Sequence, residues 1–291
     1  MVRLQVDGDV APPSLAALGV DLDADLVQID YRRPWILPVT ASGDAALPEV
    51  AWSFADAVGS LARSLLLQPE VRIVTCAGWD NAYACAERAA TALTAHGLAD
   101  VGVAAVRGSN VLPLLDDLTA AGLRFENLES GALLRSLRAP LVGADLQFGA
   151  GPLATAIAEG ARVVVVGWYD GAAPALACAV HDYGWSWQDY DRLAGAAAAA
   201  RAAAWPAPHD DIWLAGLGEI SANEPLRVEI ADSGQFTVDM PGTPSAPDGR
   251  RLAHWLRAGD SRGAAVAQAD VAWNPAPAEI TRRGAAQLHV A

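Results

Sequence analysis

The sequence predicts an α/β fold: a doubly wound, mostly parallel, Rossmann-like sheet, followed by a small C-terminal appendage that contains a β-hairpin. Three observations favour it. Short apolar runs alternate with segments of helical periodicity through the first two-thirds of the chain, which is typical of a parallel sheet covered by helices. Several helical segments end at glycine, a common helix stop. The 291 residues are 53% hydrophobic, enough to bury a sizeable core.

The predicted elements of the first two-thirds can be placed in order. We expect strands at residues 2–6, 25–30, 71–78, 101–106, 140–148 and 162–168. We expect helices at residues 50–66, 81–97, 111–122 and 151–160. Because crossovers between parallel strands are right-handed, every strand-to-helix loop should lie at the carboxyl edge of the sheet. Ligands bind at that edge in such folds.

The pattern changes after residue 185. Residues 185–205 predict a helix so rich in alanine that it must pack closely or pair with another chain, which favours a homo-oligomer. Residues 226–238 predict two strands around a turn at residues 232–234. The periodicity of residues 239–291 is too weak to assign. We therefore divide the chain into an α/β domain, 1–205, and a hairpin with an irregular tail, 206–291, packed on it.

Composition excludes several classes of protein. The net charge is −14 and there is no lysine, which argues against nucleic-acid binding and against a lysine Schiff base or a P-loop. The acidic N-terminus does not look like a signal peptide, and no apolar run is long enough to cross a membrane. The three cysteines, the acids and the histidines show no disulfide or metal-ligand spacing. We expect a soluble cytoplasmic protein without a metal.

Polar and aromatic side chains gather where the predicted strands end. Carboxylates at a water-poor sheet edge have pKa values that can be pushed apart, which suits acid and base roles. Aromatic walls suit an acyl ligand. For each acid the competing interpretation is an N-cap of the following helix. The candidates are Gly8, Asp9, Asp30, Tyr31, Cys76, Trp79, Asp80, Asn81, Asn110, Asp145, Gln147, Trp168, Tyr169 and Asp170.

Two further residues have competing roles. His181 lies eleven residues beyond Asp170 along a predicted helix, roughly 15 Å at 1.5 Å per residue, so a structural role near the helix end is favoured. Cys76 follows a buried strand and precedes a helix, where the pKa of a thiol can fall. No histidine is an obvious partner for Cys76.

The stretch GAGPLA at residues 149–154 matches a dinucleotide-binding pattern between a strand and a helix. Asp170 ends the next strand about twenty residues further on, where a ribose-binding acid is expected. This match makes an NAD(P)-dependent oxidoreductase an alternative. Our first expectation is that no cofactor is bound.

The run HDYGWSWQDYDRLAGA at residues 181–196 resembles a motif of the acyclic terpene utilisation family. Further similar stretches are CAGWDNAYACAE (76–87), RGSNVLPLLDDL (107–118), FGAGPLATAIAEGARVVVVG (148–167) and SGQFTVDMPGT (233–243). The resemblance covers about residues 1–245. It implies an α/β protein in the degradation of terpenoid acyl-CoA compounds. It also implies a small ferredoxin-like domain, which would here be a separate subunit because the chain is too short to hold it whole.

The sequence departs from the family at the polar loop residues. The family's Gly-Asp-Asp becomes Gly108, Ser109 and Asn110, and its Gly-Arg-x-x-Asp becomes the stretch 167–171, without the arginine. The family's Asn-x-Tyr becomes Asp145 and Gln147. A changed substrate would explain this, and so would loss of catalysis in a scaffold or binding subunit.

Our first functional hypothesis is a hydratase or dehydratase, a lyase acting on an acyl thioester or a related carboxylic intermediate. Such a reaction needs a general base, a general acid and donors to a developing enolate. Asp170 and Asp30 are expected to transfer protons, and Asn81 and Tyr169 to stabilise the oxyanion. Trp79 and Trp168 are expected to line the site. The alternatives are the non-catalytic subunit and the NAD(P)-dependent enzyme.

Overall fold

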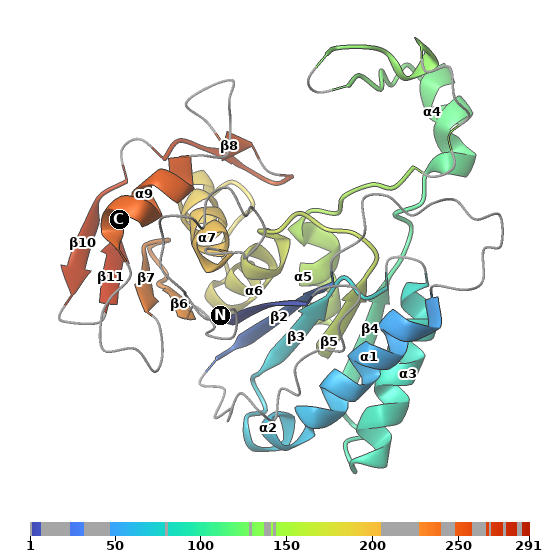
Figure 1. Ribbon diagram of the computed structural model, residues 1–291, viewed down its shortest axis with the longest axis vertical. Helices are drawn as coiled ribbons and strands as arrows, with labels where there is room; N and C mark the ends of the chain where they lie inside the picture. The colour runs from blue at the N-terminus through green and yellow to red at the C-terminus, as the bar shows by residue number, and fades with distance from the viewer. Residues whose placement is uncertain are drawn as a thin grey trace, which may run out of the picture.

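The protein is described by a computed structural model, whose elements are arranged as in Figure 1. The structure describes residues 2–6, 24–31, 47–78, 81–127, 130–136, 141, 144–204, 227–239, 248–257, 266–267, 269–275, 278–283 and 287–291. Within these residues a nine-stranded sheet runs in the order β10-β11-β7-β6-β1-β2-β3-β5-β4. The expected α/β fold is confirmed.

Five neighbouring strands form the parallel half of the sheet. They are β1 (Val2–Val6), β2 (Leu26–Tyr31), β3 (Arg72–Thr75), β5 (Ala161–Val166) and β4 (Gly102–Val106). All four pairings among them are parallel. The strands are rich in β-branched residues, which fit a sheet covered on both faces.

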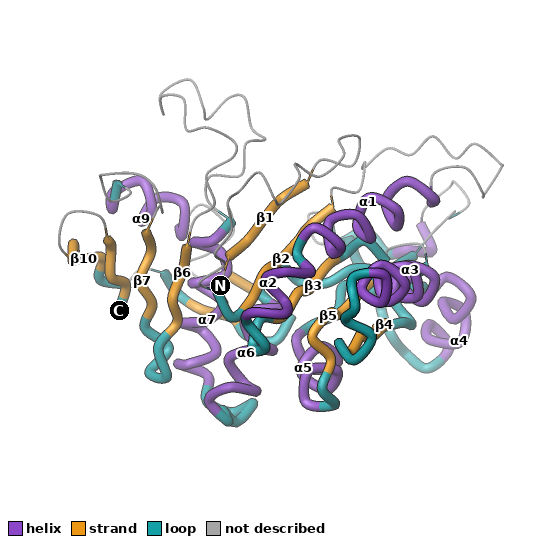
Figure 2. The backbone as a smooth tube through the Cα atoms, turned by 90° about the horizontal axis from the view of Figure 1, so that it is seen from below, coloured by secondary structure: helices purple, strands orange, loops and turns teal. Residues whose placement is uncertain are grey.

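Helices cover both faces of this half, as a doubly wound fold requires (Figure 2). On one face lie α1 (Leu47–Ser60) and α3 (Ala82–Ala95). On the other lie α5 (Ala150–Ala158) and α6 (Ala173–Tyr183). Helix α7 (Tyr190–Ala203) lies on the same side but packs against the C-terminal antiparallel strands. The helix expected at 50–66 is split at Leu61, after which α2 (Ala62–Leu67) begins. None of the described helices has both the length and the apolar character needed to span a membrane.

The C-terminal residues extend the same sheet with antiparallel strands. The hairpin of β6 (Arg227–Ile230) and β7 (Phe236–Asp239) forms as predicted, and β6 joins β1 at the pair Val2 and Arg227. β11 (Gln287–Val290) and β10 (Ile280–Arg283) continue the sheet beyond β7. The tail also holds α9 (Gly249–Arg257) and a hairpin of β8 (Val266–Ala267) and β9 (Ala272–Trp273). The domain boundary at 205 stays a prediction.

One expected strand is absent from the sheet. Among the described residues of 140–148, Asp145 and Phe148 form only isolated bridges, with Asn110 and Tyr169 respectively. These residues close a long excursion that leaves β4 and carries the 3-10 helix η2 (Leu112–Leu114), α4 (Leu115–Ala120) and η3 (Leu134–Ser136). Figure 1 shows α4 standing away from the sheet. The apolar run at 140–148 wrongly predicted a sheet strand. It belongs to the end of the excursion, where the chain comes back from α4 and η3 to the start of α5.

The alanine-rich helix α7 is packed inside the molecule. Nearly all of its alanines are buried, and it contacts α6, α9, β6 and β7. A side chain on Gly195 would clash with the carbonyl of Gly234, in the turn between β6 and β7. On the other side, the Arg201 guanidinium donates to the Trp255 carbonyl, and the Trp255 indole donates to the Arg201 carbonyl over 2.9 Å. Close packing, rather than pairing with another chain, explains the alanines.

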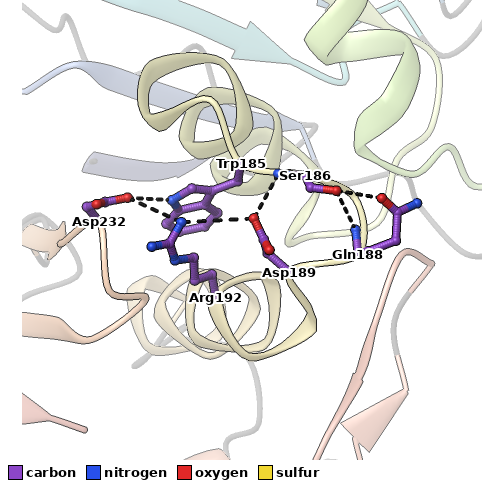
Figure 3. Close-up of polar contacts among 6 residues, drawn as sticks. All are labelled: Trp185, Ser186, Gln188, Asp189, Arg192 and Asp232. Carbon is purple, nitrogen blue, oxygen red and sulfur yellow. Dashed lines mark hydrogen bonds and ion pairs between the residues drawn. The ribbon is translucent and has the colours of Figure 1, made fainter.

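Residues 185–189, between α6 and α7, form polar contacts that connect these two helices to the β6–β7 turn (Figure 3); we call this set of contacts the joint. The Trp185 indole donates to Asp232 over 2.9 Å, and the Ser186 amide donates to Asp189 over 2.9 Å. Arg72, at the start of β3, pairs with Asp182 at the end of α6 over 2.8 Å. The joint therefore lies toward the amino edge of the sheet, and His181 is exposed there.

Candidate functional site

The candidate site lies at the carboxyl edge of the parallel half, between β3 and β5. These neighbouring strands lead to helices on opposite faces, since β3 continues into α3 and β5 into α6. This is a topological switch point, the usual ligand position in such sheets. The loop after β3 runs close to β5: the Gly78 amide donates to the Val166 carbonyl over 3.1 Å, and a side chain on Gly78 would clash with Val165.

A hydrogen-bonded group of three side chains forms across this edge. The Tyr169 hydroxyl donates to one oxygen of Asp30, and the Gln28 amide nitrogen donates to the other over 2.8 Å. Asp30 and Tyr169 are 8% and 6% exposed, and Gln28 is fully buried. Asp30 lies near the end of β2 and Tyr169 follows β5, so the Tyr169 side chain reaches past the end of β3. A buried carboxylate is thus held by two donors from separate elements.

The thiol of Cys76 is held by the end of β2. The Tyr31 amide donates to the sulfur over 3.1 Å, and the thiol donates to the Tyr31 carbonyl over 3.2 Å. Burial chiefly raises the pKa of the Tyr31 hydroxyl above its ordinary value. Burial also raises the pKa of Cys85 and of Cys178 to about 12, so both of these thiols are protonated at neutral pH.

Asp170, which directly follows Tyr169, and Asp270 each accept a backbone amide at the N-terminus of a helix. Asp170 accepts the Ala172 amide at the start of α6 over 2.9 Å and the Ala269 amide over 3.1 Å. Asp270 accepts the Ala150 amide at the start of α5 over 2.8 Å. Burial chiefly, and the nearby Asp170 in lesser part, raise the pKa of the Asp270 carboxyl. The tip of the β8–β9 hairpin is therefore fastened to the carboxyl edge through two carboxylates.

The other predicted site residues are placed as follows. The Asn81 side chain caps α3 by accepting the Ala84 amide over 3.0 Å. The Asn110 side chain accepts the Leu112 amide over 3.0 Å at the base of the excursion, where its backbone is bridged to exposed Asp145. The Gln147 amide nitrogen donates to the Tyr169 carbonyl over 3.2 Å. Trp168 is half-buried. Gly8, Asp9, Trp79 and Asp80 lie outside the described residues.

The structure thus joins the Asp30 and Tyr169 side chains, places the exposed Gln147 against the Tyr169 backbone, and joins Cys76 to Tyr31. The contacts of Asn81 and Asn110 are local helix or turn caps. Two residues of this region were missed from the sequence. Gln28 is polar in an apolar strand and two residues before Asp30, a spacing that points both side chains to one face of the sheet, so it could have been found. Asp270 lies in a tail whose weak periodicity gave no signal.

The described residues contain no cluster of three or more histidine, cysteine or acidic side chains that could hold a metal ion. The Tyr169 hydroxyl donates its hydrogen bond to the Asp30 carboxylate, and paired groups of this kind suit general acid–base chemistry. Fold and geometry together define an α/β protein with a buried carboxylate–phenol pair at the switch point of its sheet.

The model of the acyclic terpene utilisation family protein AtuA matches residues 51–202, just over half of the 291-residue chain. The chain belongs to this family, which confirms the resemblance predicted from its motifs. No curated protein and no solved structure matches the chain. The matched region contains β3, β4, β5 and Tyr169, whereas Asp30 and Asp270 lie outside it.

Proposed function

We propose that the protein is a hydratase or dehydratase of terpenoid acyl thioesters, with Asp30 and Tyr169 as its proton-transfer pair. The observation that carries the proposal is the hydrogen bond from the Tyr169 hydroxyl to the Asp30 carboxylate at the switch point. Membership of the acyclic terpene utilisation family supports the substrate class. In this proposal Gln28 fixes the orientation of Asp30 through its 2.8 Å hydrogen bond.

The pair can balance both proton transfers of a dehydration. The Asp30 carboxylate takes the proton from the carbon next to the thioester carbonyl, and the Tyr169 phenol gives its proton to the leaving hydroxyl group. Water departs and a carbon–carbon double bond forms. The proton then passes from Asp30 to the Tyr169 phenolate along their hydrogen bond, which restores the starting state. Hydration follows the same steps in reverse.

Asp170 is proposed to position Tyr169 rather than to transfer a proton. Both of its carboxylate oxygens accept backbone amides, from Ala172 and Ala269. These bonds fix the residue that directly follows Tyr169. Asn81 remains a proposed oxyanion donor through its amide group, whose oxygen caps α3.

The NAD(P)-dependent alternative is disfavoured by the residues at the start of α5. A cofactor's pyrophosphate would lie against the α5 N-terminus, but the Asp270 carboxylate accepts the Ala150 amide there and lies against Gly149. The backbone amide that a phosphate would use there is therefore already occupied by a carboxyl group of the chain itself. A non-catalytic subunit with a separate ferredoxin-like partner is the remaining alternative.

The test is turnover of enoyl-CoA and 3-hydroxyacyl-CoA thioesters with methyl-branched chains. The readouts are the absorbance of the conjugated enoyl thioester and solvent deuterium at the carbon next to the carbonyl. We expect Asp30→Asn and Tyr169→Phe each to lower kcat/KM by about 100-fold or more. The matched controls Asp116→Asn and Tyr190→Phe alter exposed side chains and should leave kcat/KM unchanged.

Two results would reject the proposal. One is turnover that survives in both Asp30→Asn and Tyr169→Phe while the variants stay folded. The other is a wild-type protein that neither turns over these thioesters nor exchanges their protons, which would favour the non-catalytic subunit.

A further inference from the structure

We propose that the outer edge of β4, together with the arm that follows it, is the interface with a second copy of this chain. The arm is defined as residues 107–147. Within it lie η2, α4 and η3, between the end of β4 and the start of α5. The leucines and the β4 residues that carry the proposal are not among the candidate catalytic residues, so it does not depend on the reaction, although Gln147 at the end of the arm contacts the Tyr169 backbone.

The first observation is that no described strand pairs with the outer edge of β4. Both faces of β4 are contacted by helices, α3 and α5. All five of its residues are nevertheless only half-buried, whereas Val163–Val166 of the neighbouring β5 are fully buried. The remaining exposure of β4 must therefore lie along its outer edge, where none of the described strands pairs with it.

The second observation is the contrast between the two edges of the sheet. The other edge strand, β10, has the sequence ITRR, and Arg282 and Arg283 are exposed. Charged side chains of this kind protect an edge against pairing with another chain. Strand β4 has the sequence GVAAV, without a charged or polar side chain. The edge at β4 lacks the protection that the edge at β10 carries, which indicates that another strand covers it.

The third observation is the unpacked apolar surface of the arm. Leu114, Leu123, Leu141 and Leu146 are between 39% and 50% exposed. No residue of the arm belongs to the main hydrophobic cluster of the described residues, and α4 stands apart from the sheet (Figure 1). Exposed apolar side chains of this kind are candidates for contact with another chain. The arm begins where β4 ends, so the two surfaces are continuous.

A second copy of the chain is the occupant that fits both surfaces. Two β4 strands can pair antiparallel about a two-fold axis, and this isologous contact uses the same patch on both chains. The pairing brings no like charges together, which matters for a chain with a net charge of −14. The same two-fold axis allows the exposed leucines of each arm to pack against the second chain. The alanine-rich helix α7 is not available for this contact because it is buried within one chain.

The experiment measures the mass of the protein in solution by light scattering after size exclusion, at about 1 to 50 µM. We expect the wild type to have the mass of two chains. For the double variant Leu114→Glu, Leu123→Glu we expect the dimer dissociation constant to rise by at least about tenfold, so that the measured mass shifts toward that of one chain. The matched control Leu66→Glu, Leu67→Glu changes two leucines on α2 that are 67% and 62% exposed, and should remain dimeric.

A second measurement tests the strand pairing itself. Cysteine is introduced singly as Val103→Cys, Ala104→Cys and Ala105→Cys, and the proteins are oxidised mildly. Facing strands bring equivalent positions within disulfide distance, so at least one of the three should give a covalent dimer, whereas Leu67→Cys should not. A monomeric wild type overturns the proposal, as does a dimer that survives the arm variant without any of these crosslinks.

Discussion

At the scale of single residues, the two acids first proposed for proton transfer have different surroundings. Asp30 is held by side chains, from Gln28 and Tyr169. Asp170 is held by backbone amides, from Ala172 and Ala269. Side-chain donors leave Asp30 in contact with a group that can itself exchange a proton, whereas the amides around Asp170 cannot do so. This difference is why Asp30 is the stronger candidate for the reacting carboxylate.

Asp270 gives a prediction about pH at the same scale. Its pKa is raised from 3.8, chiefly by burial. A carboxyl group with a higher pKa in the folded chain stabilises the fold when it is protonated. This contribution is fully present below the unfolded pKa and is lost as the pH rises through the folded pKa.

We therefore expect the wild type to gain stability relative to Asp270→Asn as the pH falls through the window above 3.8. The asparagine oxygen can still accept the Ala150 amide, so the comparison isolates the titration. Urea unfolding of both proteins across about pH 3.5 to 7 measures the difference in free energy of unfolding. A difference that stays constant over this range would contradict the assigned pKa shift.

At the scale of elements, the contact between α7 and the β6–β7 turn is set by two glycines. Gly234 has a φ of +85°, which favours glycine, and a side chain there would clash with the backbone of Arg192 in α7. Gly195 of α7 faces the Gly234 carbonyl, with no room for a methyl group. Helix and turn approach this closely only because both positions lack a side chain.

Gly195→Ala should therefore destabilise the protein by about 1–3 kcal/mol, the usual cost of overpacking. Gly151→Ala in α5 is the matched control, because a methyl group there meets nothing within 4 Å. The control should be neutral or more stable by about 0.5 kcal/mol, since alanine is the better helix former. Thermal and urea unfolding measure both. An equal effect of the two substitutions would show that the helix–turn contact is looser than described.

At the scale of the whole molecule, one hydrophobic cluster spans both parts of the chain. It includes Val163 and Leu176 from the first part and Val238, Leu252 and Leu288 from the second. The antiparallel strands continue the parallel ones in a single sheet. Among the described residues, the two parts share this one core.

We expect the full chain to unfold in one cooperative transition, with tryptophan fluorescence and far-ultraviolet circular dichroism giving the same midpoint. A chain ending at residue 205 should lack a cooperative transition. Removing residues 206–291 takes away β6 and β7 and so exposes the alanine face of α7 that these strands contact. A truncated chain that unfolds as sharply as the full one would show that residues 1–205 fold as an independent domain.

Local patterns were sufficient for most of the first two-thirds of the chain. The apolar runs of β2, β3, β4 and β5 and the helical periods between them are properties of neighbouring residues, so they predicted the fold class and the carboxyl edge. They failed at 140–148, where an apolar run returns along the arm, and at β10, where the strand ITRR has no apolar alternation. There, pairing with β11 decides the conformation.

The sequence by itself determined the family, the α/β class, the β6–β7 hairpin and the strand ends at which the candidate residues gather. Only the tertiary structure decided which of them meet. The Tyr169 hydroxyl donates to Asp30 although the two residues are 139 positions apart, and Asp270 accepts the amide of Ala150 although they are 120 positions apart. Such contacts depend on the order of strands in the sheet and on which face each helix covers. Neither is encoded in the periodicity of any one segment, because periodicity reports only which side of an element is buried.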